Sequence, residues 1–275
     1  MTTGADVDVL IPTYDRAAAL ATTLGSVAAQ DVPGLRVVIS DQSPVPSWKE
    51  PLAAAALRIV EHRGGTVRTA HRPDRRGPAE QRAYLLSRAE RRYVLFLDDD
   101  VWLEPCAVRL LRSAIAWLGC GFVGYAVQGL SYLGDERPDE QLPYEEWREP
   151  VRPERVRRGG DRWRRHHLHN AANLVHLARR HPAPPSGWRP YKVAWIGGCV
   201  LFDRAALLAA GGFDFWPDVP PEHAGEDQVA QLRVLERCGG AGLLPSRAVH
   251  LELPTTVPRR GTECYDIVFG PDVSD

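Results

Sequence analysis

Three consecutive carboxylates follow an apolar run that is typical of a buried strand. Residues 93–97 lead directly into Asp98, Asp99 and Asp100, an arrangement that burial alone does not favour. If the backbone stays extended, Asp98 and Asp100 share one face and Asp99 points to the other. Paired carboxylates at the carboxyl end of a strand suit Mg²⁺ or Mn²⁺ carrying a substrate diphosphate. The alternative is an acidic first turn of the next helix, where negative charge is stabilised by about 0.3–1 kcal/mol.

A second chemical signal is the sequence Gly225-Glu-Asp227, which stands just before an amphipathic stretch that ends near Arg237. The positive end of a helix dipole keeps a carboxylate ionised, as a general base at neutral pH requires. The same position also suits simple capping of the helix, so the pattern is compatible with both roles.

The elements that must position these carboxylates alternate between strand and helix. Residues 7–11 and 35–40 are apolar runs separated by an alanine- and leucine-rich stretch. Strand, helix and strand at this spacing predict a parallel sheet with right-handed crossovers. Asp41 follows the second run, so we expect it at the same sheet edge as Asp98. Downstream, the sequence predicts a short strand at 57–61, a basic connection at 67–77, and helices at 77–91 and 105–118.

Composition excludes several classes of protein. The formal net charge of -1 over 275 residues indicates no global attraction to nucleic acid or to a membrane surface. Five scattered cysteines without a C-x-x-C pair argue against a disulfide framework and a structural zinc site, and favour a reducing cytoplasm. The first residues resemble no signal peptide, and no apolar run approaches the ~20 residues of a transmembrane span. The oligomeric state is not indicated.

Six segments carry a resemblance to a known family, and they occur in the same order over residues 7 to about 252. The segments are Val9-Leu-Ile-Pro-Thr-Tyr-Asp-Arg16, Val37-Val-Ile-Ser-Asp41, Leu95-Phe-Leu-Asp-Asp-Asp100, Trp195-Ile-Gly-Gly-Cys199, Gly211-Gly-Phe213 and Gly225-Glu-Asp227. In this order they resemble the family 2 glycosyltransferases, inverting enzymes of the GT-A fold that use a nucleotide-diphosphate sugar.

The resemblance implies a single α/β domain with a mostly parallel central sheet flanked by helices. It implies a Rossmann-like nucleotide-sugar-binding half at 1–104 and an acceptor-binding and catalytic half at 105–252. The second half would carry an insertion at about 134–192, and 253–275 would be a flexible tail. Donor binding is implied for the residues Pro12, Thr13, Tyr14, Arg16, Asp41, Arg82, Asp98 and Asp99.

The metal and catalytic roles also come from the resemblance. Asp100 would bind a Mn²⁺ or Mg²⁺ ion that bridges the diphosphate, with Asp98 and His250 as further ligands. Asp227 would be the general base, and Glu226 would orient the acceptor or cap the helix. The enzyme would move one sugar from a donor, most commonly a UDP-sugar, to a glycan, lipid-linked, peptide or natural-product acceptor.

Two alternatives remain open at this stage. A sugar-1-phosphate nucleotidyltransferase uses a related sheet, but it has a glycine-rich N-terminal loop, and residues 12–16 contain no glycine. An inactive sugar-nucleotide-binding protein is the second alternative. The helix before the acidic strand has Gln81-Arg-Ala83 where the family commonly has Ala-Arg-Asn, so Arg82 is kept and the asparagine is missing.

Overall fold

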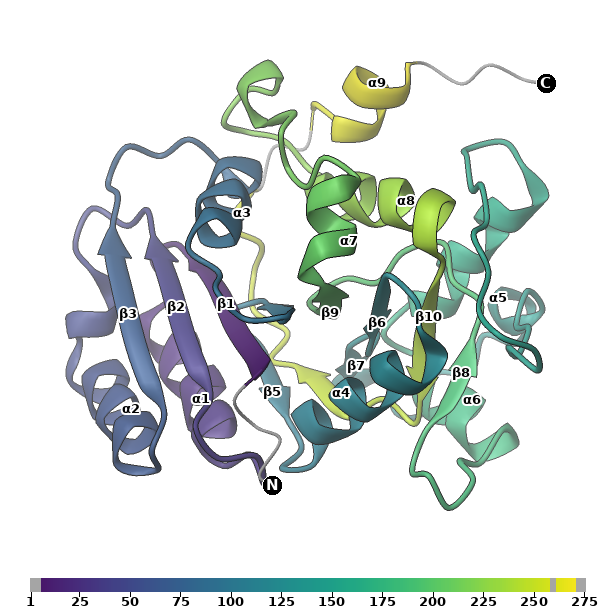
Figure 1. The fold of residues 1–275 in the computed structure, drawn as a ribbon, viewed down its shortest axis with the longest axis horizontal. Coiled ribbons are helices and arrows are strands. Elements are labelled where there is room, and N and C mark those ends of the chain that lie inside the picture. The colour runs from purple at the N-terminus through teal and green to yellow at the C-terminus, as the bar shows by residue number, and fades with distance from the viewer. Residues whose placement is uncertain (1–5, 258–260, 271–275) are drawn as a thin grey trace.

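An eight-stranded sheet runs through the computed structural model, which describes residues 6–257 and 261–270 (Figure 1). In spatial order its strands are β3 (Thr66–His71), β2 (Arg36–Asp41), β1 (Val7–Thr13), β4 (Tyr93–Leu97), β9 (Cys199–Asp203), β6 (Phe122–Gly124), β10 (Gly240–Leu244) and β8 (Arg189–Tyr191). Only β9 and β8 run against the others. The mostly parallel α/β sheet that we predicted is therefore confirmed.

Helices cover both faces of this sheet because its central strands are apolar on both sides. In β1, Val9 and Ile11 pack into the core beneath α1, α2 and α4, whereas Leu10 packs into the core beneath α3, α7 and α8. The helices are α1 (Ala17–Ala28), α2 (Pro51–His62), α3 (Pro78–Ser87), α4 (Ala107–Leu118), α7 (Arg204–Ala209) and α8 (Glu226–Cys238). Strands that are buried on both faces read as continuous apolar runs, which is why β1, β2 and β4 could be found from the sequence.

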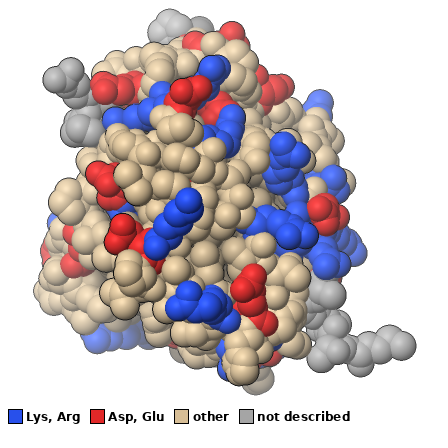
Figure 2. Space-filling view, turned by 90° about the vertical axis from the view of Figure 1, so that its left-hand side faces the viewer, with Lys and Arg blue, Asp and Glu red and all other residues tan. Residues whose placement is uncertain are grey.

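Two predicted elements are wrong. Residues 57–61, predicted as a strand, lie inside helix α2, whose buried residues Ala53, Ala56 and Val60 follow helical spacing. Residues 66–71, predicted as part of a connection, form strand β3 at the edge of the sheet. The side chains of β3 are all at least partly exposed, so this strand lacks the apolar pattern of its neighbours. On this side of the molecule Lys/Arg and Asp/Glu side chains occur among uncharged ones (Figure 2).

The acidic junction also differs from the prediction. Strand β4 ends at Leu97, and the chain then turns, with the Val101 amide donating to the Asp98 carbonyl at 3.3 Å. The backbone is therefore not extended here, and the expected alternation of Asp98, Asp99 and Asp100 does not hold. The acidic first turn does not hold either, because the next helix begins only at Ala107.

A smaller three-stranded sheet and the insertion complete the second half. The small sheet has the order β5 (Val101–Leu103), β11 (Ala248–His250), β7 (Gln128–Gly129). The short helix η3 (Leu130–Tyr132) precedes the insertion, which holds α5 (Pro138–Gln141), η4 (Asp161–His169) and α6 (Leu174–Arg180). The halves at 1–104 and 105–252 share one sheet, and their boundaries stay a prediction. Within the described residues, no helix is long and apolar enough to cross a membrane.

The C-terminal segment packs against the second half, although we expected a flexible tail. Helix α9 (Cys264–Phe269) lies on α8 with Cys264 and Tyr265 buried. The Ala224 amide donates to the Thr262 carbonyl at 3.0 Å, and the Cys264 amide to the Ala224 carbonyl at 2.9 Å. The sequence did not predict this helix, and residues 258–260 and 271–275 of the tail lie outside the described residues.

Two glycines provide a test of the packing. Gly242→Ala is expected to destabilise the protein by about 1–3 kcal/mol, because a Cβ there would lie 2.3 Å from the Tyr191 ring. Gly25→Ala, in helix α1 with no atom within 4 Å of the new Cβ, is expected to stabilise it by about 0.5–1 kcal/mol. Urea denaturation measures both, and wild-type stability of the Gly242 variant would contradict this packing.

Candidate active site

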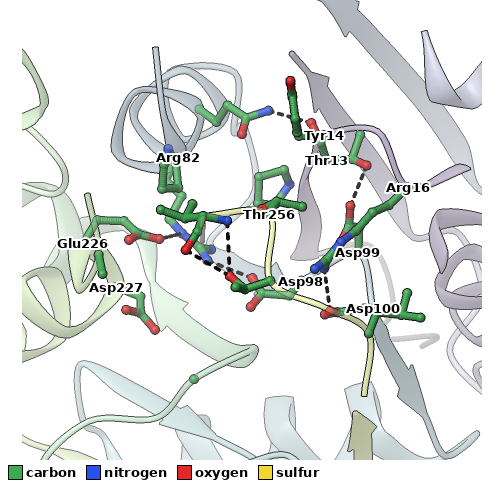
Figure 3. Close-up of a pocket in the computed structure, with 18 of the residues that line it drawn as sticks. Thr13, Tyr14, Arg16, Arg82, Asp98, Asp99, Asp100, Glu226, Asp227 and Thr256 are labelled. Atoms are coloured by element: carbon green, nitrogen blue, oxygen red, sulfur yellow. Dashed lines mark hydrogen bonds and ion pairs between the residues drawn. The ribbon is translucent and has the colours of Figure 1, made fainter. Parts of the chain in front are cut away.

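A cavity of about 470 Å³ lies where β1 and β4 end and where α3 and α8 begin (Figure 3). Both helix N-termini face it, and the helix dipoles favour anions there. From these elements it is lined by Pro12, Thr13, Tyr14, Arg16, Pro78, Gln81, Arg82, Asp98, Asp99, Asp100, Gly225, Glu226 and Asp227. His250, Gly197, His223, Ala224 and residues of the segment 253–257 complete the wall.

Of the residues predicted for the site, only Asp41 does not line this cavity. Its side chain is fully buried, and its carboxylate accepts hydrogen bonds from the amides of Ser43 at 2.8 Å and Ser47 at 2.6 Å. These contacts order the loop that follows β2. Asp41 therefore lies outside the cavity, and both of its carboxylate oxygens are used within the protein.

Arg82 joins the two acidic groups of the cavity. Its Nε donates to Glu226 at 2.9 Å, and its Nη2 donates to Asp98 at 2.8 Å. The guanidinium is buried, which opposes its charge, but Asp98, Glu226 and Asp227 outweigh this effect and raise its pKa. The permanent charge of Arg82 therefore holds α3, α8 and the end of β4 together.

Asp227 lies in the first turn of α8 and faces the cavity (Figure 3). Burial raises the pKa of its carboxyl to about 7, and the charge of Glu226 adds to the rise, while Arg82 opposes it. One carboxylate oxygen also accepts the Gln228 amide at 2.8 Å. A carboxyl that titrates near neutral pH can take up a proton during a reaction.

Asp99 and Asp100 share the guanidinium of Arg16. Arg16 Nη1 lies 3.3 Å from Asp99 and 2.6 Å from Asp100. Burial raises the pKa of Asp99 to about 7, against the hydrogen bond from Thr13 at 2.6 Å. Burial acts in the same direction on Asp100, but contacts with His250 and Arg16 outweigh it and lower the pKa of Asp100. Asp100 is thus the more firmly ionised of the two.

The residues available for a divalent ion are mainly oxygen donors. Among the described residues, no group of three His, Cys, Asp or Glu side chains is arranged to hold a metal. His250 Nδ1 accepts the Glu252 amide at 3.0 Å, so the ring proton lies on Nε2, 3.4 Å from Asp100. This tautomer donates to Asp100 and offers no lone pair, and a role of His250 as a ligand stays a prediction. Asp98, with 35% of its side chain exposed, and Asp100 suit a hard ion that also binds substrate phosphates.

Several lining residues were missed from the sequence. Gln81 donates to the Thr13 and Ser40 carbonyls, both at 3.0 Å, and so fixes the ends of β1 and β2. His223 accepts the Ala79 amide at 3.1 Å, which ties the loop before α8 to the start of α3. Gln81 precedes the predicted Arg82, but nothing in the local sequence marks His223.

The segment 253–257 was missed because its contacts are distant in the chain. Arg16 donates to the Pro254 carbonyl, and Arg75 donates to the Thr256 carbonyl at 2.8 Å. The Arg75 guanidinium also lies over the Tyr14 ring, 4.2 Å from its centroid. Two arginines therefore hold the segment on the side of the cavity that Tyr14 lines.

The fold and the site define the class of this protein. The mostly parallel sheet, with an acidic cavity at the carboxyl ends of β1 and β4, has the GT-A fold that we expected. The chain belongs to glycosyl transferase family 2, whose model matches residues 8–183, more than half of the 275 residues. No curated protein sequence matches it significantly.

Solved structures share the fold at low sequence identity. Residues 1–349 of S. aureus TarS in complex with UDP-GlcNAc align with a TM-score of 0.56 and 17% identity, over 92% of this chain and 60% of that one. Mannosyltransferase PcManGT from Pyrobaculum calidifontis in complex with GDP-Man and Mn²⁺ aligns with a TM-score of 0.53 and 20% identity, over 92% and 58%. The chain thus spans about three fifths of these relatives.

The raised pKa of Asp227 predicts an effect on stability. A carboxyl whose pKa is higher in the folded than in the unfolded protein destabilises the fold as the pH rises from about 4 through about 7. Asp227→Asn removes this effect and is expected to raise Tm at pH 8 by about 2–4 °C, with a smaller difference at pH 5. Thermal denaturation at both pH values measures it.

Glu226→Gln provides the contrast. It weakens the ion pair with Arg82, so we expect a lower Tm at both pH values. A lower Tm of Asp227→Asn at pH 8 would contradict the unfavourable burial of this carboxylate.

Proposed function

We propose that the protein transfers one sugar from a nucleotide-diphosphate donor to an acceptor with inversion, and that Asp227 is the general base. The observation that carries the proposal is that Asp227, a carboxyl with a pKa of about 7, shares one cavity with the cluster Asp98–Asp100. UDP-GlcNAc and GDP-Man bound to the structural neighbours support a nucleotide-sugar donor. UDP stays the first candidate, on family analogy.

In this proposal Asp227 removes the proton of the acceptor hydroxyl as that oxygen attacks the anomeric carbon. Attack from the face opposite the leaving diphosphate inverts the configuration, through a transition state with oxocarbenium character. General-base assistance typically contributes about 10²–10⁴-fold. Glu226 stays with Arg82, and the ion pair keeps the first turn of α8 in place. No side chain is needed as a covalent nucleophile.

The donor fits the opposite wall of the cavity. Tyr14 and Thr13 at the end of β1 would contact the nucleoside, and the Tyr14 ring is already covered by the Arg75 guanidinium. The diphosphate would lie near the N-terminus of α3, where the helix dipole favours anions. Arg16, at the same wall, provides a cation for the phosphate oxygens.

Asp98 and Asp100 would hold a divalent ion together with the diphosphate. Mg²⁺ is commonly bound by one or two carboxylates plus substrate phosphates, so a set of three protein ligands is not required. When bound, such an ion stabilises negative charge on the leaving diphosphate. His250 would orient Asp100 through the contact at 3.4 Å, and Arg16 would have to leave Asp100 as the ion arrives. The Mn²⁺ bound to PcManGT supports this assignment.

The two alternatives have become weaker. Membership of glycosyl transferase family 2 counts against a sugar-1-phosphate nucleotidyltransferase. The intact group of Asp98, Asp100, Glu226 and Asp227 counts against an inactive binding protein. The acceptor class stays open, and the cytoplasm stays the predicted location, since the five cysteines are free.

Nucleotide binding is tested by thermal shift with UDP, GDP, dTDP and CDP, each with and without Mn²⁺. One diphosphate with Mn²⁺ is expected to stabilise the protein, by about 2.7 kcal/mol at 100 times its dissociation constant. Asp100→Ala should remove the Mn²⁺-dependent part of the shift. Asp31→Asn is the control, because Asp31 is exposed, pairs with Arg109 and does not line the cavity. This variant should keep the Mn²⁺-dependent shift. No shift with any nucleotide would count against the donor site.

The base assignment is tested by Asp227→Asn. We expect a loss of transfer of at least about 10²-fold with unchanged nucleotide binding. In the wild-type enzyme the rate should rise with pH through about 7, because the base must be deprotonated. Product analysis by NMR should show the anomeric configuration opposite to that of the donor. Normal turnover by the Asn variant, or retention of configuration, would overturn this mechanism.

A further inference from the structure

We propose that Gln231 is a positioning residue that couples the helix carrying Asp227 to the strand end carrying Asp98. The coupling runs through the loop Ile196-Gly-Gly198, which forms the floor between the two carboxylates. The catalytic meaning of this coupling rests on the proposed function, in which Asp227 is the base and Asp98 serves the donor side.

Gln231 binds both backbone groups of one loop residue. It lies in α8, one turn after Asp227, and is fully buried. Its Oε1 accepts the Ile196 amide at 2.8 Å, and its Nε2 donates to the Ile196 carbonyl at 2.7 Å. The same Nε2 donates to the Asp227 carbonyl at 3.1 Å. One side chain therefore ties the loop to the turn of α8 that bears the base.

The other end of the loop is tied to the acidic junction. The Asp98 amide donates to the Gly198 carbonyl at 2.9 Å, and Gly197 between the two ties lines the cavity. Gly198 has a φ of +81°, and a Cβ there would lie 3.0 Å from Val127. Position 198 thus needs a glycine, and the loop connects Gln231 to Asp98 over three residues.

The chemistry requires an amide at this position. Of the uncharged side chains of this shape, only the carboxamide offers a donor and an acceptor side by side. An apolar replacement leaves the buried N–H and C=O of Ile196 without partners, at a cost of about 1–3 kcal/mol for each group. The loop would move to regain partners, and a displacement of about 1 Å between reacting groups can cost about 10²-fold in rate.

The chain contains a matched control for this contact. Gln30 also accepts one backbone amide and donates to two backbone carbonyls, although its partners distant in the chain are two different residues. Its Oε1 accepts the Val108 amide at 3.0 Å, and its Nε2 donates to the carbonyls of Glu104 at 2.9 Å and Ser26 at 3.0 Å. Ser26 precedes Gln30 by four residues, as Asp227 precedes Gln231. Gln30 is buried and does not line the cavity.

The test compares Gln231→Leu with Gln30→Leu by hydrogen exchange of individual backbone amides. Gln231→Leu is expected to speed exchange at Ile196 and also at Asp98, whose own partner is not mutated. Gln30→Leu, with a comparable loss of Tm, is expected to speed exchange at Val108 and to leave Asp98 protected. Unchanged protection of Asp98 in the Gln231 variant would overturn the coupling.

Turnover of UDP-GlcNAc or GDP-mannose with Mn²⁺, with water as acceptor, adds the catalytic readout. Gln231→Leu should lower kcat by about 10–100-fold, whereas Gln30→Leu should keep kcat. Equal losses of kcat in the two variants would show that Gln231 only stabilises the fold. Full activity of Asp227→Asn would overturn the assignment of Asp227 as the base and leave the coupling through Gln231 intact. The hydrogen-exchange result does not depend on which residue is the base.

If the Leu variant does not fold, Gln231→Glu answers the same question. A protonated carboxyl has one donor and one acceptor and keeps the pattern, whereas the ionised form loses the donor to Ile196. We expect protection of Asp98 at low pH and faster exchange after the new carboxyl ionises, relative to wild type at the same pH. If the protection of the Asp98 amide against exchange does not change when the new carboxyl ionises, the proposal is overturned.

Discussion

The buried guanidinium of Arg82 is the constraint on which the cleft depends. Three carboxylates, those of Asp98, Glu226 and Asp227, would otherwise face one another in a poorly solvated space. Arg82 binds two of them directly, and breaking a buried ion pair by removing one partner typically costs about 3–5 kcal/mol. One positive charge against three negative ones leaves an excess of negative charge. Burial is the main reason why Asp227 holds a proton up to about neutral pH, and this excess of negative charge adds to the rise of its pKa.

The elements around this cluster could be predicted where a buried strand requires a run of apolar residues in the sequence. The strands β1, β2 and β4 are buried on both faces, so they appear as continuous apolar runs bounded by Pro12, Asp41 and Asp98. Strand β3 could not be found in this way, because an exposed edge strand has no such pattern. The short apolar run at 57–61 fits a strand as well as a helix, and the alanines before it, in the same helix, decide for α2.

The site could be predicted in its residue types and less well in its geometry. The motifs identified Arg16, Arg82, Asp100 and Asp227, all of which line the cavity. The turn at Asp98 depends on a hydrogen bond to Gly198, a hundred residues away in the chain, and no local pattern reports such a contact. The same holds for the segment 253–257 and for Gln231, which act on the site through backbone groups. Contacts of this kind join residues far apart in the chain, and no local pattern in the sequence shows which residues they join.

In the proposed site, Arg16 would link the binding of the cation and the anion thermodynamically. Its guanidinium pairs with Asp99 and Asp100, so a divalent ion at Asp100 would have to displace it. The displaced guanidinium would then be free to pair with a phosphate oxygen at the same wall. A diphosphate that attracts Arg16 would uncover Asp100 in the same way. Each ligand would therefore increase the affinity for the other, and by the same factor. One arginine would be enough to make the cavity favour the pair of ligands over either one alone.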